Sequence, residues 1–136
     1  LGPDRIAIPI SIKIESEIVS LPEDEQKEYL EALGLELTGL DRVIRHCFKA
    51  LDLITYLTVG PKEARAWQIT QGMTAPQAAG VIHTDFETSF IRAEVTPFEV
   101  YSELGSVGAR EAGKTRIEGK SYVMQDGDVV YFRTGD

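Results

Sequence analysis

The sequence predicts an α+β protein in which a mixed β-sheet packs against one short, alanine-rich helix. The central stretch, residues 65–95, runs from a strand that carries Trp67 through a glycine turn into a helix and then into a second strand. Thr74 can accept hydrogen bonds from the free amides of the first helical turn, Pro76 fits inside that turn without a donor, and Gln77 stands three residues after the cap. These residues predict a helix that begins after Thr74.

The helix expected over residues 75–82 carries small residues on one side, which let a helix lie close to a sheet. They are Ala75, Ala78, Ala79 and Ile82. Alternate residues of a strand share one face. The strand positions expected to face the helix are Trp67, Ile69, Ile91, Ala93 and Val95. A strand, helix, strand unit of this compactness is typical of a β-grasp (ubiquitin-like) domain.

Longer stretches of the sequence resemble one protein family. The C-terminal TGS domain of the YchF or Obg-like ATPases is similar to RAWQITQGMTAPQAAGVIHTDFETSFIRAEV (residues 65–95) and to EGKSYVMQDGDVVYF (residues 118–132). The family's lead-in to that domain resembles GLDRVIRHCFKALDLITYLTVGPKEARAW (residues 39–67). The resemblance covers nearly the whole chain, from about Ile10 onward.

The resemblance implies how the chain is divided and what it does. Residues 1–52 would be a strand and two helices left from a P-loop nucleotide-binding domain, and residues 53–136 a β-grasp TGS domain. It implies a recognition or regulatory module, without an active site of its own, of a parent that hydrolyses ATP or GTP with Mg²⁺. It further implies that the parent acts in the cytoplasm at the ribosome or at another RNA or protein assembly.

The same resemblance points to one loop near the nucleotide. Ser11, Ile12 and Lys13 stand where the family carries a Ser-Ala-Lys-like loop that approaches the base. Ile12 departs from the small Ala of that loop. The residues by themselves equally allow Ser11 and Lys13 to do no more than end a strand.

Composition limits the kind of protein. A chain of 136 residues with 43% hydrophobic content holds one or at most two small domains. A single cysteine, Cys47, excludes an internal disulfide framework and favours a reducing, cytosol-like compartment. No run of about 18 apolar residues is present to span a membrane, so no membrane partner is expected. Because the chain opens on Leu1 rather than Met, we expect a piece of a longer protein.

The net charge of −8 argues against a nucleic-acid binder over the whole surface, since phosphate binding depends on Lys and Arg. DNA is therefore not an expected partner. Up to Asp52 eleven acidic residues stand against six basic ones, and from Leu53 onward eleven stand against eight, which gives −5 and −3. The second half retains enough basic residues for a local patch.

The first fifty residues are predicted to form a strand and two helices. Residues 5–14 alternate and are rich in Ile, which favours a strand. A helix is expected over residues 21–33, with a capping box made by Ser20 and Glu23 and an end at Gly34.

A second helix is expected over residues 39–51. Its apolar residues recur at helical spacing, which predicts packing on a core and burial of Cys47. They are Leu40, Val43, Ile44, Cys47, Phe48 and Leu51. His46 is not a catalytic partner for Cys47, because neighbouring helix residues point about 100° apart.

The second half is predicted to begin with a hairpin. Residues 53–59 and 64–69 would pair around the Gly60-Pro61 turn, which places the domain boundary near Asp52.

A short helix is predicted over residues 97–104, ended by Gly105, with a charged, Gly-rich connection over residues 106–119. Within it GAREAGKT (residues 108–115) matches the phosphate-binding pattern G-x-x-x-x-G-K-[ST]. A working P-loop follows a buried strand and leads into a helix, whose N-terminal amides hold the phosphates. Here a helix precedes the pattern and a strand follows it, so no nucleotide site is predicted.

The last two strands are expected over residues 121–124 and 129–133, joined by an Asp126-Gly127 hairpin turn. Asp126 and Asp128 also have the chemistry of cation ligands. No further carboxylates stand at the spacing of a Ca²⁺ loop, so the sequence favours a turn and no metal site.

Four residues are candidates for contact with RNA or protein: Arg65, Trp67, His83 and Arg92. A shared sheet edge would place them together, with Trp67 or His83 as a stacking face and the arginines supplying charge. Trp67 is also suited to the core, and the arginines to surface pairing with Glu63 and Glu94.

His83 beside Asp85 has the groups for acid-base chemistry. A structural account is favoured, in which Thr84 caps the next helical turn with Glu87 three residues on, so no catalytic residue is predicted. The alternative function class is a stand-alone ubiquitin-like binding or carrier module. Such carriers end in Gly-Gly, whereas this chain ends in Gly135 and Asp136.

Overall fold

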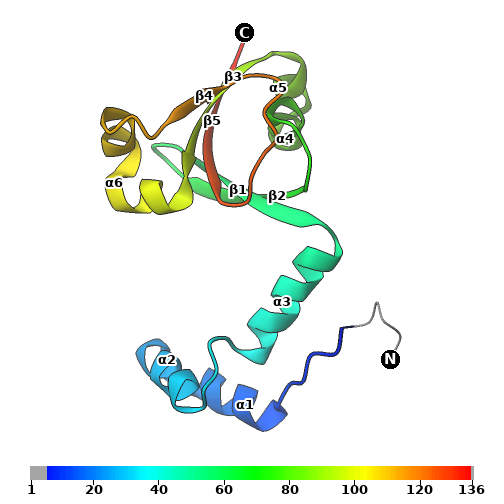
Figure 1. The fold of residues 1–136 in the computed structure, drawn as a ribbon, viewed down its shortest axis with the longest axis vertical. Coiled ribbons are helices and arrows are strands. Elements are labelled where there is room, and N and C mark those ends of the chain that lie inside the picture. The colour runs from blue at the N-terminus through cyan, green and yellow to red at the C-terminus, as the bar shows by residue number, and fades with distance from the viewer. Residues whose placement is uncertain (1–5, 136) are drawn as a thin grey trace. The chain divides into compact units, whose positions relative to one another are not determined.

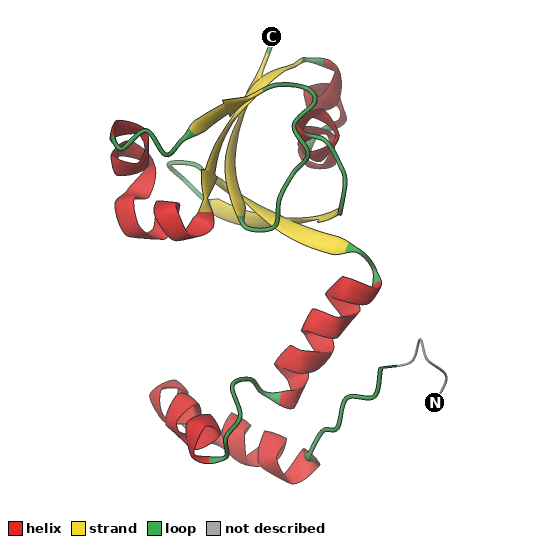
Figure 2. Cartoon of the chain, viewed as in Figure 1, coloured by secondary structure: helices red, strands yellow, loops and turns green. Residues whose placement is uncertain are grey.

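The computed structural model describes residues 6–135, and the chain divides into two compact units, Leu1–Ala50 and Leu51–Asp136 (Figures 1 and 2). Among its described residues the N-terminal unit contains three helices, α1 (Ile12–Ser20), α2 (Glu23–Ala32) and α3 (Gly39–Ala50).

The strand predicted over residues 5–14 is wrong in its described part. Residues 6–11 take no regular structure, and α1 begins at Ile12, where the Ser11 hydroxyl accepts a hydrogen bond from the Ile14 amide at 3.4 Å. Pro9 has no amide to give to a ladder, and no strand pairs with this segment among the described residues. The helix cap therefore decides the local structure. Residue 5 lies outside the described residues.

The capping box predicted for α2 is also wrong, whereas its predicted end is confirmed. Pro22 occupies the N-cap position without a side-chain bond, and the Ser20 hydroxyl instead donates to the Glu17 carbonyl at 2.7 Å. At the other end Gly34 has a φ of +66°, and its amide donates to the Glu31 carbonyl at 3.0 Å. This left-handed glycine closes the C-terminus of α2.

The apolar stripe of α3 is open to solvent. Leu40 is 63% exposed and Ile44 46% exposed, and Cys47, predicted to be buried, is exposed as well. Ile18 is the only buried hydrophobic side chain among residues 6–50. The periodicity identified the helix correctly, but the described residues of the N-terminal unit form almost no core to cover its apolar face.

The C-terminal unit is built on one mixed, five-stranded sheet, as predicted. Its strands are β1 (Leu53–Val59), β2 (Ala64–Thr70), β3 (Phe90–Pro97), β4 (Arg116–Glu118) and β5 (Asp128–Thr134). They lie in the order β2-β1-β5-β3-β4, with β1 and β5 parallel and the other pairs antiparallel. Helices α4 (Ala75–Ile82) and α5 (Thr84–Thr88) cover one face, here called the α4 face, and α6 (Phe98–Glu111) lies on the other, the α6 face (Figure 1).

Helix α4 begins after Thr74, as predicted, and lies directly on the sheet. The Thr74 amide donates to Gln77 Oε1 at 2.8 Å, so the predicted cap contact forms. Three alanines of α4, Ala75, Ala78 and Ala79, are fully buried. Because their side chains are so short, the Tyr56 hydroxyl of β1 reaches the Ala78 carbonyl at 2.9 Å. Burial raises the pKa of Tyr56 well above its usual value.

One predicted core position is wrong because β3 contains a bulge. Ile91 is 57% exposed, and Phe90, at 2% exposed, takes its place in the core. The pairing register with β5 shifts between Phe90 and Arg92, which leaves Ile91 as the extra residue. Ala93 and Val95 are fully buried, as predicted.

Helix α6 extends beyond the predicted end at Gly105. Gly105 does interrupt it, with φ 65° and ψ −177°, but a second helical segment continues to Glu111. Part of the predicted connection is thus helical, and another part is β4, which pairs with β3.

The predicted C-terminal hairpin is also wrong. Residues 121–124 make only one bridge, Thr74 to Val123, and β5 pairs with β1 and β3 instead. The turn at Asp126 and Gly127 forms, but it contacts β1, where the Asp126 carboxylate accepts a hydrogen bond from the Thr55 amide at 2.7 Å. The Asp128 carboxylate turns to other partners, the Tyr122 hydroxyl and the Gln125 amide. Each of the two aspartates therefore has its own hydrogen-bond partners within the fold.

Amide hydrogen exchange is expected to be faster in α2 than in β1 and β3. Helix α2 buries no residue, whereas Tyr56 of β1 and Val95 of β3 are fully buried, and exchange protection follows local packing. Exchange measured peptide by peptide with mass spectrometry tests this. Slower exchange over residues 23–32 than over the two strands would contradict it.

Candidate functional site

Two of the four candidate contact residues lie together on β2, an edge strand of the sheet. The Arg65 guanidinium carbon is 4.2 Å from the centroid of the Trp67 ring, a cation–π contact. The Trp67 indole nitrogen donates to Thr58 Oγ1 at 2.9 Å, and the half-buried ring also packs against the core. Trp67 therefore packs against the core and also carries the Arg65 guanidinium over its ring.

The other two candidates lie elsewhere. His83 joins α4 to α5, is 60% exposed, and accepts a hydrogen bond at Nδ1 from the Asp85 amide at 3.3 Å. It is His83, rather than Thr84, that caps α5. Arg92 lies on β3, which β1 and β5 separate from β2, a distance of about 15 Å at ordinary strand spacing. The structure therefore does not bring the four residues to a single edge.

Arg92 also faces the opposite side of the sheet from Arg65. Arg65 shares its face with Trp67, whose partner in the ladder is Tyr56, so both belong to the α4 face. Arg92 stands opposite Arg133 in the ladder, and Arg133 reaches Glu94 on the α6 face. Strand order and the bulge at Ile91, neither of which is visible in the sequence, decide this separation.

Glu94 does not pair with Arg92, the pairing weighed from the sequence. Its Oε2 accepts from Arg110 Nη2 at 2.8 Å and its Oε1 from Arg133 Nε at 3.1 Å. The Glu94 side chain is only 11% exposed. Burial by itself raises the pKa of Glu94, but the hydrogen bonds and charges of Arg133 and Arg110 lower it overall. No sequence pattern indicated this cluster, because its members come from β3, α6 and β5.

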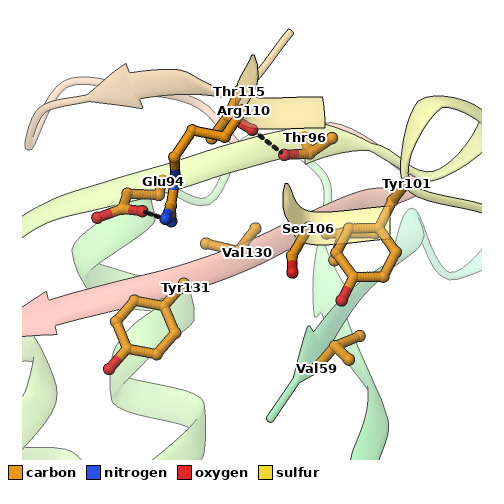
Figure 3. Close-up of a pocket in the computed structure, with 10 residues that line it drawn as sticks. Val59, Glu94, Thr96, Tyr101, Ser106, Arg110, Thr115, Val130 and Tyr131 are labelled. Atoms are coloured by element: carbon orange, nitrogen blue, oxygen red, sulfur yellow. Dashed lines mark hydrogen bonds and ion pairs between the residues drawn. The ribbon is translucent and has the colours of Figure 1, made fainter. Parts of the chain in front are cut away.

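A pocket of about 200 Å³ lies between α6 and the sheet (Figure 3). Tyr101, Ser106 and Arg110 line it from α6, and Figure 3 shows Thr96 joined to Thr115 by a hydrogen bond of 2.9 Å. Its other lining residues are Val59, Glu94, Val129, Val130 and Tyr131.

A second pocket of about 220 Å³ shares Glu94, Arg110 and Thr115 with the first and adds Ile117 and Arg133. We call this second pocket the arginine groove. The two pockets therefore adjoin each other on the α6 face, and sequence patterns did not reveal them.

The predicted base-proximal residues lie at the start of α1. Ser11 caps the helix, Ile12 is 83% exposed, and the Lys13 Nζ lies 3.9 Å from a carboxylate oxygen of Glu17. All three are on the surface of the N-terminal unit.

The P-loop-like pattern GAREAGKT spans the end of a helix rather than its start. The amides of Gly113 and Lys114 donate to the carbonyls of Arg110 and Ala109, at 3.0 and 2.8 Å, and so cap the C-terminus of α6. Strand β4 follows at Arg116. In a phosphate-binding loop such amides would face the ligand, whereas here they are already bonded.

Calorimetric titration of this chain with Mg-ATP is expected to show no binding at tens of micromolar. The amides of the pattern are occupied, and the end of a helix carries a partial negative charge that repels phosphate. The variant Lys114→Ala serves as the comparison and should give the same flat titration. Saturable binding that Lys114→Ala removes would make GAREAGKT a nucleotide site after all.

No helix in the described part of the chain is both long and apolar enough to cross a membrane.

Known proteins resemble this chain in sequence. A family model described as "YchF-GTPase_C: Protein of unknown function (DUF933)" matches residues 53–135. The chain is 54% identical to the Ribosome-binding ATPase YchF of Pasteurella multocida, covering 94% of this chain and 36% of that protein. It is 44% identical to the Obg-like ATPase 1 of Homo sapiens, covering 96% of this chain and 33% of that protein. The chain thus spans about a third of the length of the curated relatives it matches.

Solved structures resemble it as well. The Schizosaccharomyces pombe YchF GTPase matches with a TM-score of 0.80 at 37% identity, covering 97% of this chain and 35% of that one. A GTP binding protein from Pyrococcus horikoshii OT3 is similar in fold, with a TM-score of 0.52 at 21% identity over 83% of this chain and 29% of that one. The family model covers more than half of this chain, and the Pasteurella multocida relative is identical to it at 54% of the aligned positions. This chain therefore belongs to the YchF family and corresponds to its C-terminal part.

Proposed function

We propose that this chain is the recognition and regulatory part of a longer YchF-type or Obg-like protein that hydrolyses ATP or GTP. In this proposal residues 53–136 form a TGS domain with a β-grasp fold, and residues 1–52 complete the nucleotide-binding domain. The parent binds the nucleotide and Mg²⁺ outside this chain, which carries no active site of its own. It works in the cytoplasm at the ribosome or another RNA or protein assembly.

The difference in internal packing between the two units is the observation that carries this proposal. Among residues 6–50, the N-terminal unit exposes the apolar stripe of α3 and buries one hydrophobic side chain, so further structure is expected to cover it. The C-terminal unit has a full core of its own between α4 and the sheet. An incomplete unit followed by a self-sufficient one fits the end of a catalytic domain joined to an appended module.

The strand arrangement supports the β-grasp assignment. A β-grasp sheet places its first and last long strands parallel at the centre and lays one helix across a single face. Here β1 and β5 are parallel neighbours, and α4 lies on the α4 face with its three buried alanines.

The names of two relatives support the ribosome as the proposed partner. The Pasteurella multocida and Bacillus subtilis proteins are each called a ribosome-binding ATPase, and this chain is 54% and 49% identical to them. Arg65 stacked on Trp67 supplies one surface for stacking on a base or a peptide, and Arg92 supplies charge on the other face. Ser11, Ile12 and Lys13 are proposed to lie near the nucleotide base, and the side chains of Ile12 and Lys13 are exposed.

Ribosome co-sedimentation of the longer protein tests the proposal. The intact protein should pellet with ribosomes, and a form that lacks residues 53–136 should remain in the supernatant while it still hydrolyses ATP. The double variant Arg65→Ala with Arg92→Ala should weaken pelleting. Arg45→Ala with Lys49→Ala, which removes the same two positive charges from α3, should not. If the shortened form pellets as well as the intact protein, recognition lies elsewhere in the parent.

A further inference from the structure

The α6 face carries an unbalanced cluster of positive charge. Arg92 of β3 and Arg133 of β5 are direct partners in the antiparallel ladder, and like charges in that arrangement destabilise a sheet. Arg110 of α6 joins them, and Glu94 is the carboxylate that binds two of the three. These four residues sum to +2 in a chain of net charge −8.

Arg92 adds to this imbalance. Among the ion pairs of the described residues, Glu94 is already shared by Arg110 and Arg133, and none includes Arg92. The repulsion between Arg92 and Arg133 therefore costs stability, and a bound anion would reduce it.

The arginines also keep donors for a ligand. A guanidinium has five N–H groups, and Arg110 and Arg133 each give one to Glu94. Arg110 is 67% exposed and Arg133 48% exposed, so the remaining donors are open to solvent. The arginine groove, with a volume of about 220 Å³, provides the space beside them.

An aromatic surface adjoins the groove. The Arg133 guanidinium carbon lies 4.5 Å from the centroid of the Tyr131 ring, and Tyr131 is 52% exposed. Tyr101 and Ser106 line the neighbouring pocket, as Figure 3 shows. Arginines for phosphates beside tyrosines for bases are the combination used to hold single-stranded nucleic acid.

We infer that Arg92, Arg110 and Arg133 form a binding site for the phosphates of single-stranded RNA, with Tyr131 as a stacking platform beside them. An acidic peptide also matches the charge, but it has no ring to place on Tyr131, so RNA fits the surface better. This inference rests on the proposed function and assigns its RNA contact to the α6 face. It differs from the surface of Arg65 and Trp67, which lies on the α4 face.

Fluorescence anisotropy of this chain with a labelled oligouridylate tests the site. Arg110→Ala and Arg133→Ala should each weaken binding about tenfold, the effect of losing one or two charge-assisted hydrogen bonds. Each lost phosphate contact should lower the slope of log K against log salt by about 0.7. Arg45→Ala on α3 is the matched control, removes the same single charge, and should leave binding unchanged.

Glu94→Gln is the sharpest variant, because it should strengthen binding. It keeps the shape of the side chain but removes the competing negative charge, and we expect about fivefold tighter RNA binding. A purely structural role for the cluster predicts no such gain. Arg110→Ala and Arg133→Ala remove partners of Glu94 and could prevent folding, which Trp67 fluorescence would show. In that case Glu94→Gln and Arg92→Ala still test the site, since Arg92 makes no hydrogen bond among the described residues.

The other outcomes overturn the inference. Equal binding of oligoglutamate would identify an acidic-peptide site, and equal binding of inorganic phosphate would identify a site for a free anion. If Glu94→Gln and all three arginine variants bind RNA with unchanged affinity, this surface is not the RNA-binding site. Absence of RNA binding would remove the site but leave the proposed function intact, provided that ribosome pelleting still requires residues 53–136.

Discussion

Replacement of Tyr56 by alanine is expected to lower the free energy of unfolding of the C-terminal unit by roughly 3–5 kcal/mol, the range for truncating a buried aromatic residue. The Tyr56 side chain is fully buried, packs edge-on against Phe132 with ring centroids 5.9 Å apart, and donates to the Ala78 carbonyl. Its removal leaves a cavity at the contact of α4 with the sheet and an unpaired carbonyl. A loss of this size is comparable to the whole stability of many small domains.

Urea unfolding followed by tryptophan fluorescence measures this effect. Trp67 is the only tryptophan and lies in the C-terminal unit, so its signal reports that unit. Tyr56→Phe separates the hydrogen bond from the packing and should cost about 1 kcal/mol. Tyr131→Ala, at a residue that is 52% exposed, is the matched control and should change little. Equal losses at Tyr56 and Tyr131 would show that the core is not where the structure places it.

Replacement of Gly105 by alanine is expected to destabilise the same unit by roughly 1–3 kcal/mol. The backbone at Gly105, with φ 65° and ψ −177°, lies in a region that only glycine occupies without strain. An added Cβ would meet no atom within 4 Å, so the loss would come from the backbone alone. The kink lies between Tyr101 and Ser106, so relief of the strain would also move two walls of the pocket beneath α6.

Gly119→Ala is the control for this second prediction. An added Cβ there also meets no atom within 4 Å, and Gly119 does not have a left-handed φ. It should be neutral or slightly stabilising, because alanine restricts the unfolded chain. The same urea titration compares the two variants. An unchanged midpoint in Gly105→Ala would mean that α6 does not require this conformation.

The parts of the fold that the sequence predicted are those fixed by neighbouring residues. Helix α4 was found because Thr74, Pro76 and Gln77 act within one turn, and the hairpin of β1 and β2 because a Gly-Pro turn joins two apolar runs. The predictions were wrong where residues far apart in the sequence determine the local structure. The Ile-rich residues before α1 alternate like a strand but have no ladder, and the short β4 exists only because β3 lies beside it.

The candidate site was also predicted only where its residues are close in the sequence. Arg65 and Trp67 were expected to be neighbours, since residues two apart on a strand share a face, and they are in contact. Arg92 was expected at the same sheet edge as Arg65 but lies on β3, an inner strand, because strand order depends on contacts across the whole unit. The bond of Glu94 to Arg110 and Arg133 joins residues 16 and 39 positions apart, a distance over which sequence patterns carry no information.

The central position of β5 bears on how the protein is made. As the chain emerges during synthesis, β1 with β2 and β3 with β4 can pair early, but the strand that joins them appears last. Until then β1 and β3 each present an open edge of free amides and carbonyls, which is the kind of surface that mispairs with other chains. Nascent chains stalled before Asp128 should therefore be the stage most prone to aggregation and most dependent on chaperones.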